Sequence, residues 1–204
     1  MLANGAVVNQ AMKNGATPLC IAAENGHFEV VKILLVKDAV AVNQARTDGA
    51  TPLLMAAYNG HLKAVEVLLE NGVAVNQAMP NGTTPLFMAA QNGHFEVVEA
   101  LLANGAVVNQ AMTNGATPLL IAAENEHLVV MKALLEKGAR LNATELSTIK
   151  ADAYEEYMKV VAVLERTSAG ISQEFKGSLK RIAAEDKDSI CPSEVTKKVR
   201  GPGE

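Results

Sequence analysis

A unit of about 33 residues recurs four times in this chain and constrains the fold more than any other feature of the sequence. The triplet Thr-Pro-Leu begins at residues 17, 51, 84 and 117, which gives steps of 34, 33 and 33 residues. An Ala-Ala pair and then a histidine follow each triplet at a constant distance, the histidines being His27, His61, His94 and His127. Self-similarity at such a period is typical of solenoids, in which each repeat packs only on its neighbours.

Each repeat predicts two short helices. Thr-Pro starts the first helix, because Thr caps a helix N-terminus and Pro suits the first helical position. Asn-Gly before the histidine predicts the turn between the helices. The second helix begins at the histidine, and its apolar residues form a broad stripe suited to a helix between two layers, at positions 28, 30, 31, 33, 34 and 35 of the first repeat. Gly72, Gly105 and Gly138 stand where a helix ends in a left-handed residue.

The helix pair is followed by Val-Asn-Gln-Ala and then by Asn-Gly or Asp-Gly, which are strong turn signals. A period near 33 that carries T-P-L-x-x-A-A and G-H resembles the ankyrin repeat. The resemblance implies an all-α solenoid of helix-turn-helix layers with projecting β-hairpin-like fingers. One position departs from the family, whose T-P-L-H histidine ties neighbouring repeats together by hydrogen bonds. Apolar contact is expected there instead, because the four repeats hold Cys20, Leu54, Phe87 and Leu120.

The chain divides into a repeat region and a C-terminal extension. Residues 1–142 are the predicted repeat domain, with a partial finger at 1–16 and repeats that start at 17, 51, 84 and 117. Residues 143–190 are a predicted helical extension that caps the stack, with one longer helix over roughly 147–166 and a short one around Phe175 to Ala183, and 191–204 a predicted disordered tail. The 36–40 stretch has an extra residue and no glycine, which predicts a frayed or bulged helix end.

Residues 1–19 match residues 101–119 at 17 of 19 positions, so the chain begins inside a repeat. Because a solenoid end normally needs a polar capping unit, we expect an excised piece of a longer array. We expect a monomer whose uncapped N-terminal face offers a surface for self-association.

Composition excludes several classes of function. The formal net charge of −4 argues against a general nucleic-acid binder, which needs a basic stripe. Two cysteines cannot make a disulfide framework, and no apolar run reaches the roughly 18 residues that span a bilayer. Without a signal segment at its start, the chain is expected in the cytoplasm.

The histidines do not predict a metal or catalytic site. All four hold one repeat position, so the stack separates them by about 10 Å per layer, whereas metal ligands converge at about 2 Å. Cys20 is expected to be a packed small residue, and Glu24, Glu124 and Glu126 to be solvated surface. No phosphate loop or Cys-x-x-Cys motif is present, so no cofactor is expected and the chain is interpreted as non-catalytic.

The resemblance implies binding of another protein through the fingertips and the concave face of the first helices. Methionines at the finger turns would add a deformable apolar strip, unless they fold back onto the adjacent finger. Mapped by position, the candidate partner-binding residues are Lys13, Glu24, Arg46, Thr47, Tyr58, Met79, Pro80, Gln91, Met112, Thr113 and Glu124.

Four hypotheses about the biological setting stay open. The near-identical repeats resemble those of intracellular bacteria and protists, which favours a secreted effector that acts on host proteins in the host cytoplasm. The first alternative is the targeting or adaptor portion of a larger enzyme or ubiquitin-ligase-type complex, which would need a recruitment motif in 143–204. The second is a spacer without selective contacts. A nuclear signal at Lys197-Lys198-Val199-Arg200 is a weaker hypothesis than a solvated tail.

Overall fold

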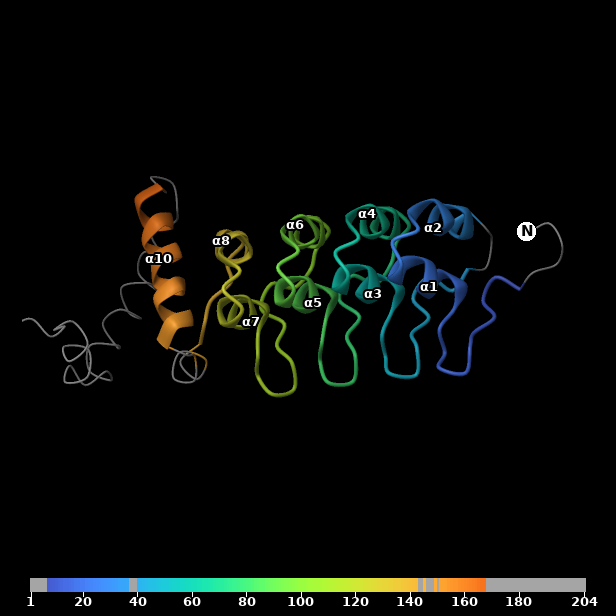
Figure 1. Ribbon diagram of the computed structural model, residues 1–204, viewed down its shortest axis with the longest axis horizontal. Helices are drawn as coiled ribbons and strands as arrows, with labels where there is room; N and C mark the ends of the chain where they lie inside the picture. Colours follow the sequence, from blue (N-terminus) through green and yellow to red (C-terminus); the bar gives the residue numbers. More distant parts are fainter. Residues whose placement is uncertain (1–6, 37–39, 143–144, 146–148, 150, 168–204) are drawn as a thin grey trace, which may run out of the picture. The chain divides into compact units, whose positions relative to one another are not determined.

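Four helix pairs follow one another along the chain in the computed structural model (Figure 1). The first helices are α1 (Pro18–Glu24), α3 (Pro52–Tyr58), α5 (Pro85–Gln91) and α7 (Pro118–Glu124). The second helices are α2 (Phe28–Leu35), α4 (Leu62–Glu70), α6 (Phe95–Ala103) and α8 (Leu128–Glu136). A longer helix, α10 (Ala151–Thr167), follows them.

The structure describes residues 7–36, 40–142, 145, 149 and 151–167. The chain forms two compact units, residues 1–161 and 162–204, and all four helix pairs belong to the first. Within that unit the first helices contact one another in chain order and so do the second helices, which makes two parallel layers (Figure 1). The described residues form helices and turns without a strand, so the predicted all-α repeat solenoid is confirmed.

The helix ends follow the predicted local signals. Each threonine side chain accepts a hydrogen bond from the backbone N–H three residues later, at 3.1 to 3.3 Å, and proline holds the first helical position. Gly72, Gly105 and Gly138 have φ values of 72°, 85° and 92°, which is the left-handed conformation predicted for these helix ends.

The core is a column of repeated positions. The leucine of each Thr-Pro-Leu triplet is buried, and the Ala-Ala pairs let neighbouring first helices approach closely. The position held by the family histidine is also apolar and buried, since Cys20 is 0%, Leu54 2%, Phe87 4% and Leu120 8% exposed. The expected apolar contact is therefore found at this position.

Histidines at another repeat position, directly before the second helices, link neighbouring repeats. The Nε2 atoms of His61, His94 and His127 donate to the backbone carbonyls of Glu24, Tyr58 and Gln91 at 3.1, 3.0 and 3.0 Å. Each of these carbonyls lies at the end of the first helix in the preceding repeat. Three of the four repeat histidines, all except His27, thus have the structural role that their shared repeat position predicted.

Asparagines of the Val-Asn-Gln-Ala stretches form a second ladder between repeats. The Oδ1 atoms of Asn9, Asn43 and Asn76 accept from the backbone N–H groups of Ala41, Ala74 and Val107 at 2.8 to 2.9 Å. These bonds satisfy backbone donors in segments that lack regular secondary structure, which explains why an amide side chain recurs there.

The N-terminal face of the first repeat differs from the prediction. Val30 and Ile33 were expected to lie between two layers, but they are 46% and 56% exposed. Val97, which occupies in the third repeat the place of Val30, is only 1% exposed. The difference arises because no earlier helix pair covers this side of α2 among the described residues.

Helix α2 ends at Leu35, one residue earlier in the repeat than the other second helices, and Val36 is 81% exposed. Residues 37–39 of the predicted bulge lie outside the described residues, as do the predicted short helix around 175–183, the tail 191–204 and the Lys197–Arg200 cluster. The longer helix predicted over roughly 147–166 is observed as α10.

The fourth repeat is linked to the extension by a buried carboxylate. Glu145 is 3% exposed and accepts hydrogen bonds from the backbone N–H and the hydroxyl of Thr117. Its other oxygen accepts from the N–H of Asn142 at 2.8 Å, while the Asn142 side chain accepts from the N–H of Glu145 at 2.9 Å. This reciprocal pair is a capping box, in which Asn142 and Glu145 each satisfy the other's backbone donor.

Candidate functional site

The finger turns project beside the layer of first helices (Figure 1). In the first finger the N–H of Gly15 donates to the carbonyl of Met12 at 2.9 Å, and the other fingers repeat this tight turn. Backbone hydrogen bonds join neighbouring fingers where the residue at the turn has an N–H group. The N–H groups of Thr47 and Thr113 donate to the carbonyls of Asn14 and Asn81 at 2.9 Å, whereas Pro80 at the same repeat position has no N–H to donate.

The ends of the first helices form a second row of candidate residues. Glu24, Tyr58, Gln91 and Glu124 are each the last residue of such a helix. The backbone carbonyls of the first three accept the histidine hydrogen bonds, so their positions are held by the framework and not by their own side chains. The Tyr58 side chain is 46% exposed, and the other three residues are half-buried.

Arg46 connects the two rows. Its guanidinium lies 3.6 Å from the carboxylate of Glu24 and 3.1 Å from that of Asp48, and its side chain is 21% exposed. Its Nε is buried and finds no hydrogen-bond partner in the described part of the chain. The pairing of Arg46 with Glu24 crosses from the second finger to the first helix pair, which a sequence period does not reveal because only this repeat has an arginine at that position.

The finger methionines are not a uniformly exposed strip. Met12 is 61% exposed, whereas Met79 and Met112 are half-buried. Of the remaining finger candidates, Lys13, Thr47, Pro80 and Thr113 are exposed. The accessible chemistry of this surface is therefore mixed, with one aromatic ring, partly covered thioethers and a neutralised arginine.

Neither an activated thiol nor a cluster of metal ligands is found among the described residues. Burial raises the pKa of the Cys20 thiol to about 11, against a weaker lowering effect of Arg46, so the thiol stays protonated at neutral pH. No group of three or more His, Cys, Asp or Glu side chains that could hold a metal ion occurs in the described part of the chain. No helix within that part combines the length and apolar character needed to span a membrane.

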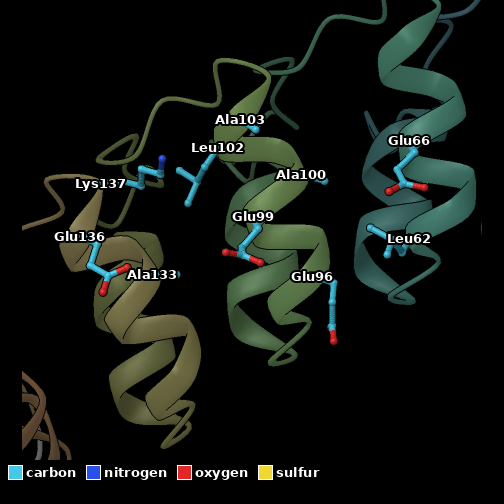
Figure 2. Close-up of a pocket in the computed structure, with 10 residues that line it drawn as sticks. All are labelled: Leu62, Glu66, Glu96, Glu99, Ala100, Leu102, Ala103, Ala133, Glu136 and Lys137. Carbon is cyan, nitrogen blue, oxygen red and sulfur yellow. The ribbon is translucent and has the colours of Figure 1, made fainter.

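The structure also shows a hollow on the second helices, which sequence reasoning missed. It has a volume of about 500 Å³ and is lined by α4, α6 and α8 together with Lys137 (Figure 2). Leucine and alanine side chains line its apolar part, namely Leu62, Leu102, Ala100, Ala103 and Ala133. Its acidic part consists of Glu66, Glu96, Glu99 and Glu136. The sequence signal that could have revealed this hollow is the small size of two alanines. Ala100 and Ala133 occupy, in the third and fourth repeats, the position that Ile33 and Val67 hold in the first two.

Comparison with protein families gives a match over most of the chain. The family described as ankyrin repeats, in three copies, matches residues 1–79 and again residues 71–145. Comparison with curated proteins gives no match.

Proposed function

Because this chain belongs to the ankyrin repeat family, whose repeats generally mediate protein–protein interaction, we propose that it binds a partner protein through its fingertips and the concave face of its first helices. Ankyrin repeats are typically non-catalytic interaction modules, and the proposed role needs no catalysis. The proposed contact residues are the eleven finger and helix-end residues predicted from the sequence.

One observation carries this proposal. The helix ends hold a tyrosine, a glutamine and two glutamates on backbones that the same histidine contact fixes in three of the four repeats. Side chains that differ on a repeated framework present a distinct surface without altering the fold. Tyr58 supports the proposal further, because an accessible aromatic ring on a rigid element is a common centre of binding energy.

The test replaces side chains without touching the framework. The change Tyr58→Ala keeps the carbonyl that accepts from His94 and from Asn92, and Met79→Ala keeps the finger N–H that donates to Thr83. The partner is first identified by affinity purification with the full chain from native and host lysates. Its dissociation constant for the double variant should then rise by more than about tenfold, as for loss of a hot spot, with an unchanged melting curve.

A matched control removes one polar and one exposed apolar side chain elsewhere. Glu29 and Val129 are exposed on α2 and α8, and the variant Glu29→Ala, Val129→Ala should keep full affinity. If the control loses binding and the Tyr58, Met79 variant keeps it, the partner uses the second helices and the proposed residues are wrong. Unchanged binding by every finger variant would favour the spacer hypothesis.

The same purification tests the finer hypotheses. A host protein recovered specifically would support the effector hypothesis, and components of an enzyme or ubiquitin-ligase-type complex that are lost on deletion of 143–204 would support the adaptor hypothesis.

For self-association, the apolar side chains on the N-terminal face are the ones to test, since Val30 and Ile33 are 46% and 56% exposed. If the chain forms dimers through this face, the variant Val30→Ser, Ile33→Ser should be a monomer in light scattering.

A further inference from the structure

The hollow across the second helices has features of a docking groove (Figure 2). We propose that this groove binds a basic amphipathic helix of another protein, with apolar side chains of that helix on the alanines and leucines and its Lys and Arg side chains at the glutamates. The inference does not rest on the finger proposal, because every described residue that lines the hollow lies on a second helix or directly after one.

Side-chain size creates the hollow. Ala100 and Ala133 replace the isoleucine and valine of the first two repeats, and Ala103 stands where the fourth repeat has Glu136. Ala100 and Leu102 remain partly accessible, so the hollow keeps an apolar floor that water covers in the free protein. Burial of that floor by apolar side chains of a partner removes surface from water, which is favourable.

The glutamates that line the groove determine the charge of the ligand that it binds. Glu66, Glu96 and Glu99 are exposed, and none of them forms an ion pair with another described residue. Within the same part of the chain, the ion-pair contact of Glu136 is one of 3.9 Å with Lys132 on its own helix. Lys137 is the one cation that lines the hollow among the described residues. A ligand with several positive charges therefore gains electrostatic complementarity, whereas an acidic ligand is repelled.

The backbone of the groove favours a helix as the occupant. A peptide that binds by adding a strand needs a sheet edge for its N–H and C=O groups, and the described lining residues belong to helices or, in the case of Lys137, follow one. A helix brings its own backbone hydrogen bonds and buries one apolar stripe. Three adjacent helices span two spacings of roughly 8–10 Å each, so about 20 Å, which matches a helix of roughly 13 residues at about 1.5 Å per residue.

The first experiment measures binding of a defined probe to the full chain by fluorescence anisotropy. The probe is a labelled synthetic helix of about four turns with leucines at i, i+3, i+4 and i+7 and Lys or Arg elsewhere. We expect saturable binding that weakens as ionic strength rises from about 0.05 M to about 0.3 M, because salt screens exposed charges. A probe with the same leucines but Glu in place of Lys and Arg should not bind. No binding of the basic probe, or equal binding of both probes, overturns the proposal.

Charge-matched variants locate the site. The variant Glu66→Gln, Glu99→Gln should weaken probe binding by at least about tenfold, since both unpaired carboxylates are neutralised. The control Glu29→Gln, Glu155→Gln has the same net charge, and both of its positions are exposed away from the hollow, so it should change affinity by less than about twofold. Equal weakening by both variants would show that net charge alone attracts the probe, and would overturn the proposal.

Filling the hollow provides a test that leaves charge unchanged. Ala100→Leu should weaken probe binding by at least about tenfold, while Ala74→Leu, an exposed position outside the hollow, should not. Equal affinity of the Ala100→Leu variant and the wild type would show that the probe does not use the hollow.

Two further outcomes would contradict the assignment. Loss of probe binding in the Tyr58→Ala, Met79→Ala variant would move the site to the fingers. A lower light-scattering mass of the Glu66→Gln, Glu99→Gln variant than of the wild type would assign the groove to a second copy of the chain. Failure of the finger proposal would be seen with the purified partner alone and would leave the probe results unchanged.

Discussion

The contact between a glycine of one repeat and a histidine of the next allows a sharp test of how the repeats are coupled. A Cβ at Gly60 would lie 2.6 Å from the His94 ring, whose Nε2 donates to the Tyr58 carbonyl at 3.0 Å. The change Gly60→Ala therefore forces the imidazole to move and puts a side chain on a backbone with φ of 72°. Gly72 has the same φ of 72°, but a Cβ there would meet no atom of the described residues within 4 Å.

The two substitutions separate strain from contact. Left-handed backbone costs an alanine roughly 1–2 kcal/mol, which Gly60→Ala and Gly72→Ala share. Loss of the imidazole–carbonyl hydrogen bond costs about 0.5–1.5 kcal/mol, and the disturbed packing adds to it. We therefore expect Gly72→Ala to lower the free energy of unfolding by about 1 kcal/mol and Gly60→Ala to lower it by about 2–4 kcal/mol.

Guanidinium denaturation followed by circular dichroism gives both values, and a cycle with His94→Ala identifies the contact. In the His94→Ala background the additional cost of Gly60→Ala should fall to that of Gly72→Ala, because no ring remains to be displaced. Equal costs of the two glycine substitutions in the wild type, or a fully additive cycle, would refute the inference that this glycine makes room for the histidine.

Three further changes test other parts of the fold. Glu126 has φ of 59° at the position of the glycines, and no later histidine packs there among the described residues, so Glu126→Gly should raise the free energy of unfolding by about 1 kcal/mol and a decrease would contradict this. Leu86 is 1% exposed, so Leu86→Ala should cost about 2–5 kcal/mol, and an unchanged melting curve would show that it is not buried. The pKa of the Cys20 thiol is raised from 9.0 to about 11 in the folded chain, so the thiol of the unfolded chain loses its proton at a lower pH. The contribution of Cys20 to the free energy of unfolding therefore falls as pH rises from 9 to 11. Over that range Cys20→Ala should lose less stability than the wild type, as denaturation at several pH values would show.

The fold was predictable because its signals are local and repeat. Threonine caps, prolines at the first helical position and glycines at helix ends each act within a few residues, so a single repeat predicts its own helix boundaries. Packing of the Thr-Pro-Leu leucines and of Cys20 also followed from the sequence, because positions that recur in every layer of a solenoid face the same neighbours.

Contacts between repeats were decided by the tertiary structure. The sequence marked the histidines as structural, but only the stack shows that His61, His94 and His127 reach the first helix of the preceding repeat over a separation of 36 or 37 residues. The pairing of Arg46 with Glu24 and the exposure of Val30 likewise depend on which layer lies next to them. A period gives the spacing of layers along the chain but not which atoms meet between them.

The candidate surfaces show the same division. Family resemblance placed candidate residues at finger turns and helix ends, whereas the half-burial of Met79 and Met112 is visible only in the folded chain. The hollow arises where alanines of adjacent second helices replace larger residues, and its charge comes from glutamates that lie far apart in sequence. Sequence alone determined the repeat, its helices and its caps, because these depend on interactions within one unit. The grooves and ion pairs were decided by tertiary structure, because they depend on the side chains that stacking brings together.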